Sequence, residues 1–277
     1  MQLVPGFNRS RLRLKAAVAA LAAAAVAVIL VVLLTGASPT TGYDISYPQC
    51  GGAYPANPLF GIVGVNGGLA NNANPCLAKE LTWAQQAPGQ RAPAQPRLAL
   101  YIDTGNPGAH HVADWPRHGR APGYGSCNGL LTNACSYLYG KQRAEVSYRL
   151  VSALDRDGAE RSPWWLDVET MQSWAGTYAL NIAAIRGYLD GLTAAGAHGQ
   201  LGIYSTAVQW QEITGLTPVM TVKRLHRRLP AWIAAVDTTI TGARYNCRQT
   251  GFTGSNPALA QYQVRGFDAD LRCGSNS

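Results

Sequence analysis

The sequence is poor in charged residues and has few histidines, methionines and phenylalanines. Of its 277 residues only 14% are Asp, Glu, Lys or Arg, and there are 5 His, 3 Met and 4 Phe. No repeat or low-complexity tract follows the alanine-rich segment near the N-terminus. These features argue against a disordered or repetitive protein and favour a globular one.

Patterns for metals and nucleotide cofactors are also missing. The cysteines form no CxxC pair and no Cys/His spacing that is typical of zinc. The glycines of Gly64-Val65-Asn66-Gly67-Gly68 lack the spacing and the downstream acid of a dinucleotide fingerprint, so we interpret them as a tight turn. We therefore expect no metal and no cofactor.

The first 37 residues differ from the rest of the chain. A flank with four basic residues and no acid precedes the segment Ala16–Leu34, which is apolar throughout. This order is typical of a secretory signal, although the run nearly reaches the roughly 20 residues that span a bilayer. We expect residues 1–37 to be a signal peptide or signal anchor, and residues 38–277 to be secreted or anchored at the outer face of the cytoplasmic membrane.

All six cysteines follow this segment, which fits an oxidising compartment. Several connectivities are possible, and proximity in the sequence favours Cys50–Cys76, Cys127–Cys135 and Cys247–Cys273. We interpret all of them as structural disulfides.

The charge of the exported part is mild. Four of the 23 Lys and Arg lie in the N-terminal flank, which leaves 19 against 15 acids, about +4. We expect no nucleic-acid partner. The dense basic cluster Lys223–Arg228 is interpreted as a solvated face, with contact to an anionic wall polymer or a membrane surface as the alternative.

Short apolar segments alternate with helical patterns, which predicts β/α units and a parallel sheet. A 240-residue exported part suits one domain, and eight strand candidates suggest an irregular TIM-type (β/α) barrel. The helices are predicted at Cys76–Gln86, Tyr139–Arg156 and Tyr178–Ala195, and Thr104–Ser136 is predicted as a long loop stapled by a disulfide. The strands are predicted at Tyr43–Ser46, Phe60–Asn66, Leu98–Asp103, Trp164–Glu169, Leu201–Ser205, Ala231–Ala235, Leu259–Gln263 and Phe267–Asp270.

Acids fall near the ends of four of these strands: Asp44, Asp103, Asp167 with Glu169, and Asp268 with Asp270. The carboxyl ends of barrel strands build the active site, and residues i and i+2 of a strand share a face. Mutual repulsion and burial raise the pKa of such grouped carboxylates, and glycoside hydrolysis uses one protonated and one ionised carboxyl. The alternatives are helix caps at Asp103 and Asp270, and a divalent metal site.

Aromatic residues, 24 in all, support a sugar ligand, because flat rings pack on the apolar faces of sugars. Core packing is the alternative for each ring. The residues that we predict to bind substrate are Ser46, Tyr101, Asp103, Tyr204, Trp232, Tyr262 and Asp270.

An ordered set of motifs then resembles the glycoside hydrolase family 25 lysozymes and the related lysozyme-like domains of exported actinobacterial proteins. The motifs lie between Gly42 and Cys273: Tyr43–Ser46, Trp165–Glu169, Gly202–Ser205 with Trp210, Pro230–Ala234, Gln261-Tyr262 and Phe267–Asp270. The resemblance implies an irregular β/α barrel that cuts peptidoglycan without a cofactor. It implies Glu169 as the general acid, Asp167 as its assistant at the reacting centre, and Asp44 and Asp268 as the acidic floor.

The sequence departs from that family at the walls of the cleft, in Tyr47–Gly52, in Asn66-Gly67-Gly68 and at Asp103. We expect a retaining glycosidase that acts on a cell-wall polysaccharide, most simply peptidoglycan. The alternative is a non-catalytic protein that binds or scaffolds wall glycan on a lysozyme-like barrel. The sequence leaves open whether an enzyme carboxylate or the substrate's own acetamido group is the nucleophile.

Overall fold

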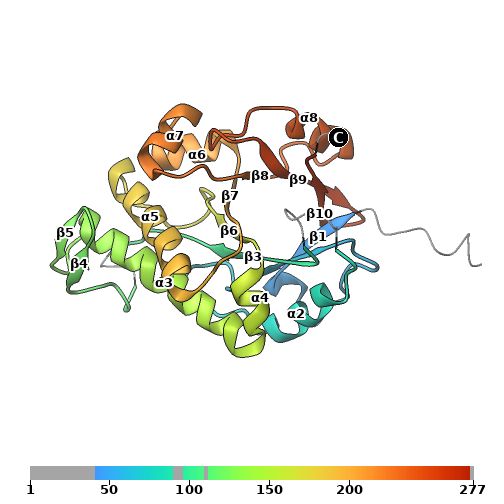
Figure 1. Ribbon diagram of the computed structural model, residues 1–277, viewed down its shortest axis with the longest axis horizontal. Coiled ribbons are helices and arrows are strands. Elements are labelled where there is room, and N and C mark those ends of the chain that lie inside the picture. Colours follow the sequence, from blue (N-terminus) through green and yellow to red (C-terminus); the bar gives the residue numbers. More distant parts are fainter. Residues whose placement is uncertain (1–40, 90–95, 109–111, 275–277) are drawn as a thin grey trace, which may run out of the picture. The chain divides into compact units, whose positions relative to one another are not determined.

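The computed structural model describes residues 41–89, 96–108 and 112–274 (Figure 1). Eight of its strands are β1 (Gly42–Ile45), β2 (Gly61–Gly64), β3 (Leu98–Asp103), β6 (Trp164–Asp167), β7 (Leu201–Ser205), β8 (Ala231–Ile233), β9 (Pro257–Val264) and β10 (Phe267–Arg272). They close into one barrel in the order β1-β2-β3-β6-β7-β8-β9-β10. All eight predicted strands are present, which confirms a mixed α/β fold with a closed eight-stranded barrel. The predicted apolar segment Ala16–Leu34 lies outside the described residues.

The sheet is parallel except at β10, which runs antiparallel to both of its neighbours. The prediction of a purely parallel sheet is therefore wrong at this strand. A two-residue turn, Arg265-Gly266, joins β9 to β10 with φ angles of 52° and 83°, and so short a connection can only make a hairpin. As a result β10 begins, rather than ends, at the edge where the parallel strands have their carboxyl ends, which we call the barrel mouth.

The helices are α2 (Leu77–Gln85), α3 (Asn133–Leu154), α4 (Arg156–Arg161), α5 (Tyr178–Ala195), α6 (Ala207–Thr214), α7 (Pro218–Leu225) and α8 (Ile240–Cys247), with a 3₁₀ turn at Tyr47–Gln49. Threonines cap several of them: Thr132, Thr206 and Thr239 each accept a hydrogen bond from a first-turn amide, as N-caps do. Helix α5 ends at Gly196, whose φ of 116° suits glycine.

The segment predicted as one long loop, Thr104–Ser136, is partly ordered into a hairpin. Strands β4 (Gly119–Ala121) and β5 (Gly125–Cys127) pair with each other, and α3 already begins at Asn133. Glycines with positive φ supply the turn, and the Cys127–Cys135 disulfide ties the hairpin to α3. In Figure 1 the hairpin lies at the N-terminal end of α3, outside the barrel, so it does not cover the mouth.

The barrel wall is buried on both faces, as near-continuous apolar strands require. The adjacent Trp164 and Trp165 illustrate this, because they point to opposite sides of β6. Trp164 packs on the helix side against Tyr148 of α3. Trp165 points into the barrel and packs with Phe60, Ile62 and other inward residues. Both indoles are fully buried, so this strand anchors the inner and the outer core together.

The three disulfides join Cys50 to Cys76, Cys127 to Cys135 and Cys247 to Cys273, which confirms the predicted pairing. No helix within residues 41–89, 96–108 and 112–274 has the length and apolar character needed to cross a membrane.

Helices α3 and α5 approach each other through glycines. A Cβ built on Gly187 would lie 2.0 Å from the carbonyl oxygen of Tyr137, and one on Gly140 would lie 2.2 Å from the carbonyl oxygen of Ala184. Because both obstacles are backbone atoms, no side-chain movement can relieve the overlap.

We predict that Gly187→Ala lowers the free energy of unfolding by about 1–3 kcal/mol, because overpacking outweighs the gain of roughly 1 kcal/mol in helix propensity. Denaturant unfolding measures the change. Gly176→Ala is the control, since a Cβ there meets nothing within 4 Å. An unchanged or higher stability of Gly187→Ala would contradict the close approach of the two helices.

Candidate active site

Six acids gather at the barrel mouth in three neighbouring pairs: Asp103 with Asp167, Asp44 with Asp270, and Glu169 with Asp268. We call them the acidic cluster. The ion pairs formed among the described residues include none of these six. Like charges this close disfavour the state in which all of the acids are ionised. A hydrogen bond joins the two carboxyls in each of the first two pairs, so one member of each of these pairs carries a proton.

The Asp103–Asp167 pair spans two adjacent strands. Asp103 of β3 and Asp167 of β6 lie directly opposite each other in the sheet register. Both are nearly buried, with 7% and 6% of their surface exposed. Burial raises the pKa of Asp103 to about 6, and burial together with the charge of Asp103 raises the pKa of Asp167 well above its usual value. Asp167 therefore holds the proton of this pair.

Amide donors hold Asp103 in place without adding charge. The backbone N–H of Gly68 donates to its Oδ2 at 3.0 Å, and Gln172 Nε2 lies 3.4 Å from its Oδ1. Asn66 fixes the backbone of Asp103 by donating to its carbonyl at 3.0 Å and accepting from its N–H at 2.7 Å. The turn Asn66-Gly67-Gly68 thus acts as a cradle for this carboxylate.

The second pair, Asp44 and Asp270, lies across β1 and β10. Burial, and then the charge of Asp268, raise the pKa of Asp44 to about 7. Asp270 is 1% exposed, and its pKa rises well above the usual value through burial and the charge of Asp44. Gln261 Nε2 donates to Asp44 Oδ2 at 3.0 Å and Gln261 Oε1 accepts from Tyr204 OH at 2.9 Å, so a fixed polar chain crosses the mouth.

The third pair, Glu169 and Asp268, lies at the rim and is only partly buried. Burial raises the pKa of each, and the charge of Asp268 raises that of Glu169 further. Gln209 Nε2, from α6, donates to Glu169 Oε1 at 3.0 Å, and this bond lowers the Glu169 pKa. Glu169 is thus an oriented carboxyl that solvent can reach.

A tight turn after β6 presents Glu169. The strand ends at Asp167, but the N–H of Val168 still donates to the Tyr204 carbonyl at 2.9 Å, so the extended alternation continues for one residue. The Glu169 N–H then donates to Gln172 Oε1 at 3.0 Å, and Trp174 Nε1 donates to the Glu169 carbonyl at 2.8 Å. Asp167 and Glu169 consequently share one face, as their spacing predicted.

Aromatic rings form the floor beneath the acids. Trp232 of β8 is 1% exposed and contacts Tyr204, Trp165 and Tyr101, with ring centroids 4.4, 5.9 and 6.1 Å apart. Tyr101 and Tyr204 keep part of their surface exposed. The two tyrosines can therefore meet a ligand, whereas Trp232 supports them from below.

Of the residues predicted for the site, most come together at the mouth and one does not. Ser46 lies beside Tyr101 at Gly64, and the acids and the inner aromatic rings converge as described. Tyr262 points outward instead, packs with Ala243 and Ala269 under α8, and donates to Thr41 Oγ1 at 3.3 Å. The adjacent Gln261 occupies the inward position, as alternation along a strand requires.

Sequence reasoning missed the glutamines that position the acids. Gln172 and Gln209, together with Trp174, lie in turns or at a helix start. Nothing in the spacing of these residues along the sequence indicates that they contact the acids. Gln261 occurs in a motif but was not expected to bond Asp44. Among the described residues, no group of three or more His, Cys, Asp or Glu side chains could hold a metal ion.

Comparisons with known proteins agree with the sequence motifs. Residues 128–246 match the family model described as Lysozyme-like protein 1. The chain is thus similar to lysozyme-like domains of the family 25 type over this part, as its motifs predicted. No curated protein sequence matches the chain significantly.

Several solved structures resemble the chain at low identity. A muramidase from Trichobolus zukalii is 16% identical with a TM-score of 0.49, over 86% of this chain and 95% of that one. A bacterial lysozyme from Streptomyces coelicolor is 17% identical with a TM-score of 0.45, over 87% and 94%. A Tat-secreted protein from Mycobacterium tuberculosis is 13% identical with a TM-score of 0.41, over 86% and 96%. Likenesses at this level say nothing about activity.

The raised pKa values predict that folding is favoured by acid in the range from about pH 4 to pH 7. Between the ordinary pKa of an unfolded Asp and the values of about 6 and 7 in Asp103 and Asp44, the folded state binds more protons, so stability falls as pH rises. These two groups alone are expected to lower the free energy of unfolding by roughly 5 kcal/mol from pH 4.5 to pH 7.5. Denaturant unfolding across this range measures the slope.

The control is Asp103→Asn, which removes one titrating group and is expected to flatten the slope. Asp157→Asn, on the exposed side of α4, is expected to leave it unchanged. Stability that rises with pH over this range would contradict the shared protonation of the acidic cluster.

Proposed function

We propose that this protein is an exported glycoside hydrolase that cleaves a cell-wall polysaccharide, with peptidoglycan as the first candidate. The observation that carries the proposal is the acidic cluster, whose six carboxyls lie together at the barrel mouth and form no ion pair with any described residue. A purely structural role does not account for so unfavourable an arrangement, whereas acid-catalysed cleavage of a glycosidic bond uses one protonated and one ionised carboxyl held close together. The family-model match and the ordered motifs support the same class of enzyme.

In this proposal Glu169 is the general acid. Its raised pKa keeps the proton at neutral pH more often than an ordinary glutamate would, and its partial exposure lets a glycosidic oxygen approach. Glu169 donates its proton to that oxygen as the bond to the anomeric carbon breaks, and the leaving sugar takes the proton. A water molecule finally adds its oxygen to the anomeric carbon and gives a proton back to Glu169, which completes the hydrolysis. The positive charge that develops on the remaining sugar ring faces the ionised partners in the acidic cluster.

The deeper acids have supporting roles in the proposal. The Asp103–Asp167 pair carries one shared proton, so Asp167 can hydrogen-bond the substrate's N-acetyl group while the pair keeps a negative charge near the reacting centre. Asp44 and Asp268 complete the acidic floor. Ser46, Tyr101 and Tyr204 line the same mouth and are proposed to contact the sugar. Asp270 lies below Asp44 and influences the pKa of Asp44.

The location and wider architecture belong to the proposal as well. The barrel is taken as an irregular TIM-type barrel, because its parallel strands direct their carboxyl ends to one site and only β10 departs. Residues 1–37 are proposed as a signal peptide or signal anchor that exports residues 38–277 and could hold them at the outer face of the membrane. The three disulfides support an oxidising, extracellular location.

The test is the release of reducing ends from purified peptidoglycan by the disulfide-intact protein, with product masses to locate the cut. We expect Glu169→Gln to lower the rate at least about a hundredfold, because the amide has no proton to donate. Glu212→Gln, an exposed change on the same α6 region, is the matched control and should keep full activity. No release by the folded parent protein that still binds wall material would instead favour the non-catalytic glycan-binding function.

Gln209 offers a second test, because it positions Glu169 without touching substrate. Removing its hydrogen bond in Gln209→Ala is expected to raise the Glu169 pKa further, which shifts the alkaline limb of the pH–activity profile to higher pH. We also expect kcat to fall about tenfold while KM changes little, since the variant loses the bonds that hold Glu169 and the adjacent Thr170 but alters none of the residues proposed to contact the sugar. A lower rate with an unmoved alkaline limb would show that Gln209 acts only through stability.

A further inference from the structure

A cavity of about 410 Å³ lies outside the barrel, between the first half of α5 and the α6–α7 region. Its lining includes Tyr124, Asn133, Tyr178, Arg186, Arg224 and His226, and contains no acid. Its volume falls within the range of small-ligand sites, roughly 300–1,000 Å³. It shares no lining residue with the acidic cluster.

Two arginines give this cavity an uncompensated positive charge. Arg186 donates to Tyr124 OH at 3.2 Å, and its guanidinium carbon lies 5.3 Å from the centre of the Tyr124 ring. The ion pairs formed among the described residues include neither Arg186 nor Arg224. An arginine that is held on an aromatic ring but lacks a carboxylate is free to bind an external anion.

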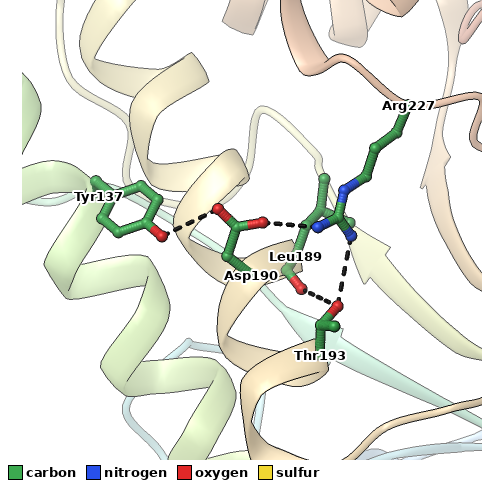
Figure 2. Close-up of polar contacts among 5 residues, drawn as sticks. All are labelled: Tyr137, Leu189, Asp190, Thr193 and Arg227. Atoms are coloured by element: carbon green, nitrogen blue, oxygen red, sulfur yellow. Dashed lines mark hydrogen bonds and ion pairs between the residues drawn. The ribbon is translucent and has the colours of Figure 1, made fainter. Parts of the chain in front are cut away.

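The nearest acid on α5, Asp190, is already occupied (Figure 2). Arg227 Nη2 donates to Asp190 Oδ1 at 2.7 Å, and Tyr137 OH donates to Asp190 Oδ2 at 3.0 Å. Arg227 Nη1 also reaches Thr193 Oγ1 at 3.4 Å. This contact fastens the basic segment 223–228 to α5, and the adjacent residues Arg224 and His226 line the cavity.

The basic segment 223–228 therefore contains residues of three kinds. Arg227 binds to α5, Arg224 and His226 line the cavity, and Lys223 and Arg228 do neither. His226, with a φ of 54°, ends α7 and reverses the chain between Arg224 and Arg227. Lys223 and Arg228 are exposed and do not line the cavity. A merely solvated basic run has no need of this arrangement.

We propose that this cavity binds an anionic polysaccharide, with Arg186 and Arg224 on its acidic group and the rings of Tyr124 and Tyr178 on its sugar faces. Guanidinium groups bind phosphate and carboxylate oxygens in pairs, and exposed tyrosine rings pack on sugars. Tyr178 is 55% exposed and so presents its ring to solvent. The site stands apart from the hydrolytic proposal, since it concerns binding alone.

Helix α6 links the two sites. Its residue Gln209 bonds Glu169, and its last residue, Thr214, lines the cavity. Eight helical residues span about 12 Å, so one extended glycan could occupy both sites.

The test is fluorescence anisotropy on the full-length protein with four labelled probes: polygalacturonate oligomers, poly(glycerol phosphate), neutral dextran and single-stranded DNA. We expect binding of an anionic probe that weakens with salt, and little binding of dextran. Preference for polygalacturonate would assign a carboxylate ligand, and preference for poly(glycerol phosphate) a phosphodiester one. Equal binding of dextran, or tighter binding of single-stranded DNA, would overturn the proposal.

Matched variants separate a built site from general attraction. Arg186→Gln and Arg224→Gln are each expected to weaken anionic binding about tenfold, as the loss of a charged hydrogen bond does. Lys223→Gln and Arg228→Gln remove the same charge outside the cavity and should change it less than about twofold. An equal loss in both sets would overturn the site. Because Arg224 is exposed, its variant keeps the test valid even if Arg186→Gln fails to fold.

Discussion

The constraint on which the structure depends is the confinement of six carboxyls at one barrel mouth, where the described residues form no ion pair with any of them. A lysine or arginine among them would lower every pKa and leave all of the acids ionised. Glutamine and backbone amides take that place: Gln172, Gln209 and Gln261 each donate to one acid. An amide orients a carboxyl while adding no charge, so the acids stay in place and still share protons.

The aromatic floor supports the strands that carry the acids. It also buries the carboxyls, which disfavours their ionised form. Trp165 and Trp232 fill the barrel beneath the acids, and burial at this depth raises the pKa of Asp167 and of Asp270 well above the usual value. The same rings join the inner core to the strands that carry the acids. The side chains that stabilise the inner core therefore also raise the pKa values of the acids above them. Folds commonly contain such unfavourable arrangements at functional sites.

Much of this was predictable from the sequence, because buried parallel strands leave continuous apolar runs and strand alternation fixes the facing of Asp167 and Glu169. The direction of β10 was not, since it depends on a two-residue turn that resembles any short loop. The hairpin of β4 and β5 has strands too short to show a period. The facing of Tyr262 depended on the strand register, and the glutamine donors on contacts between distant segments, neither of which a single sequence reveals.

The distribution of charge follows from the same constraint. Residues 38–277 carry a net charge of about +4, and two of their arginines lie on the α5–α7 side, where Arg227 pairs with Asp190 and Arg186 rests on Tyr124. The ion pairs among the described residues leave the acidic cluster unneutralised, and the arginines of the α5–α7 side form a positive surface away from these acids. A polysaccharide that bears acidic groups is then attracted to the α5–α7 side, and the charge of the acidic cluster repels it from the mouth. In the two proposals, an acidic segment of one polymer would bind on the α5–α7 side and a less charged segment at the mouth, so the separation of charge would favour one position of the glycan.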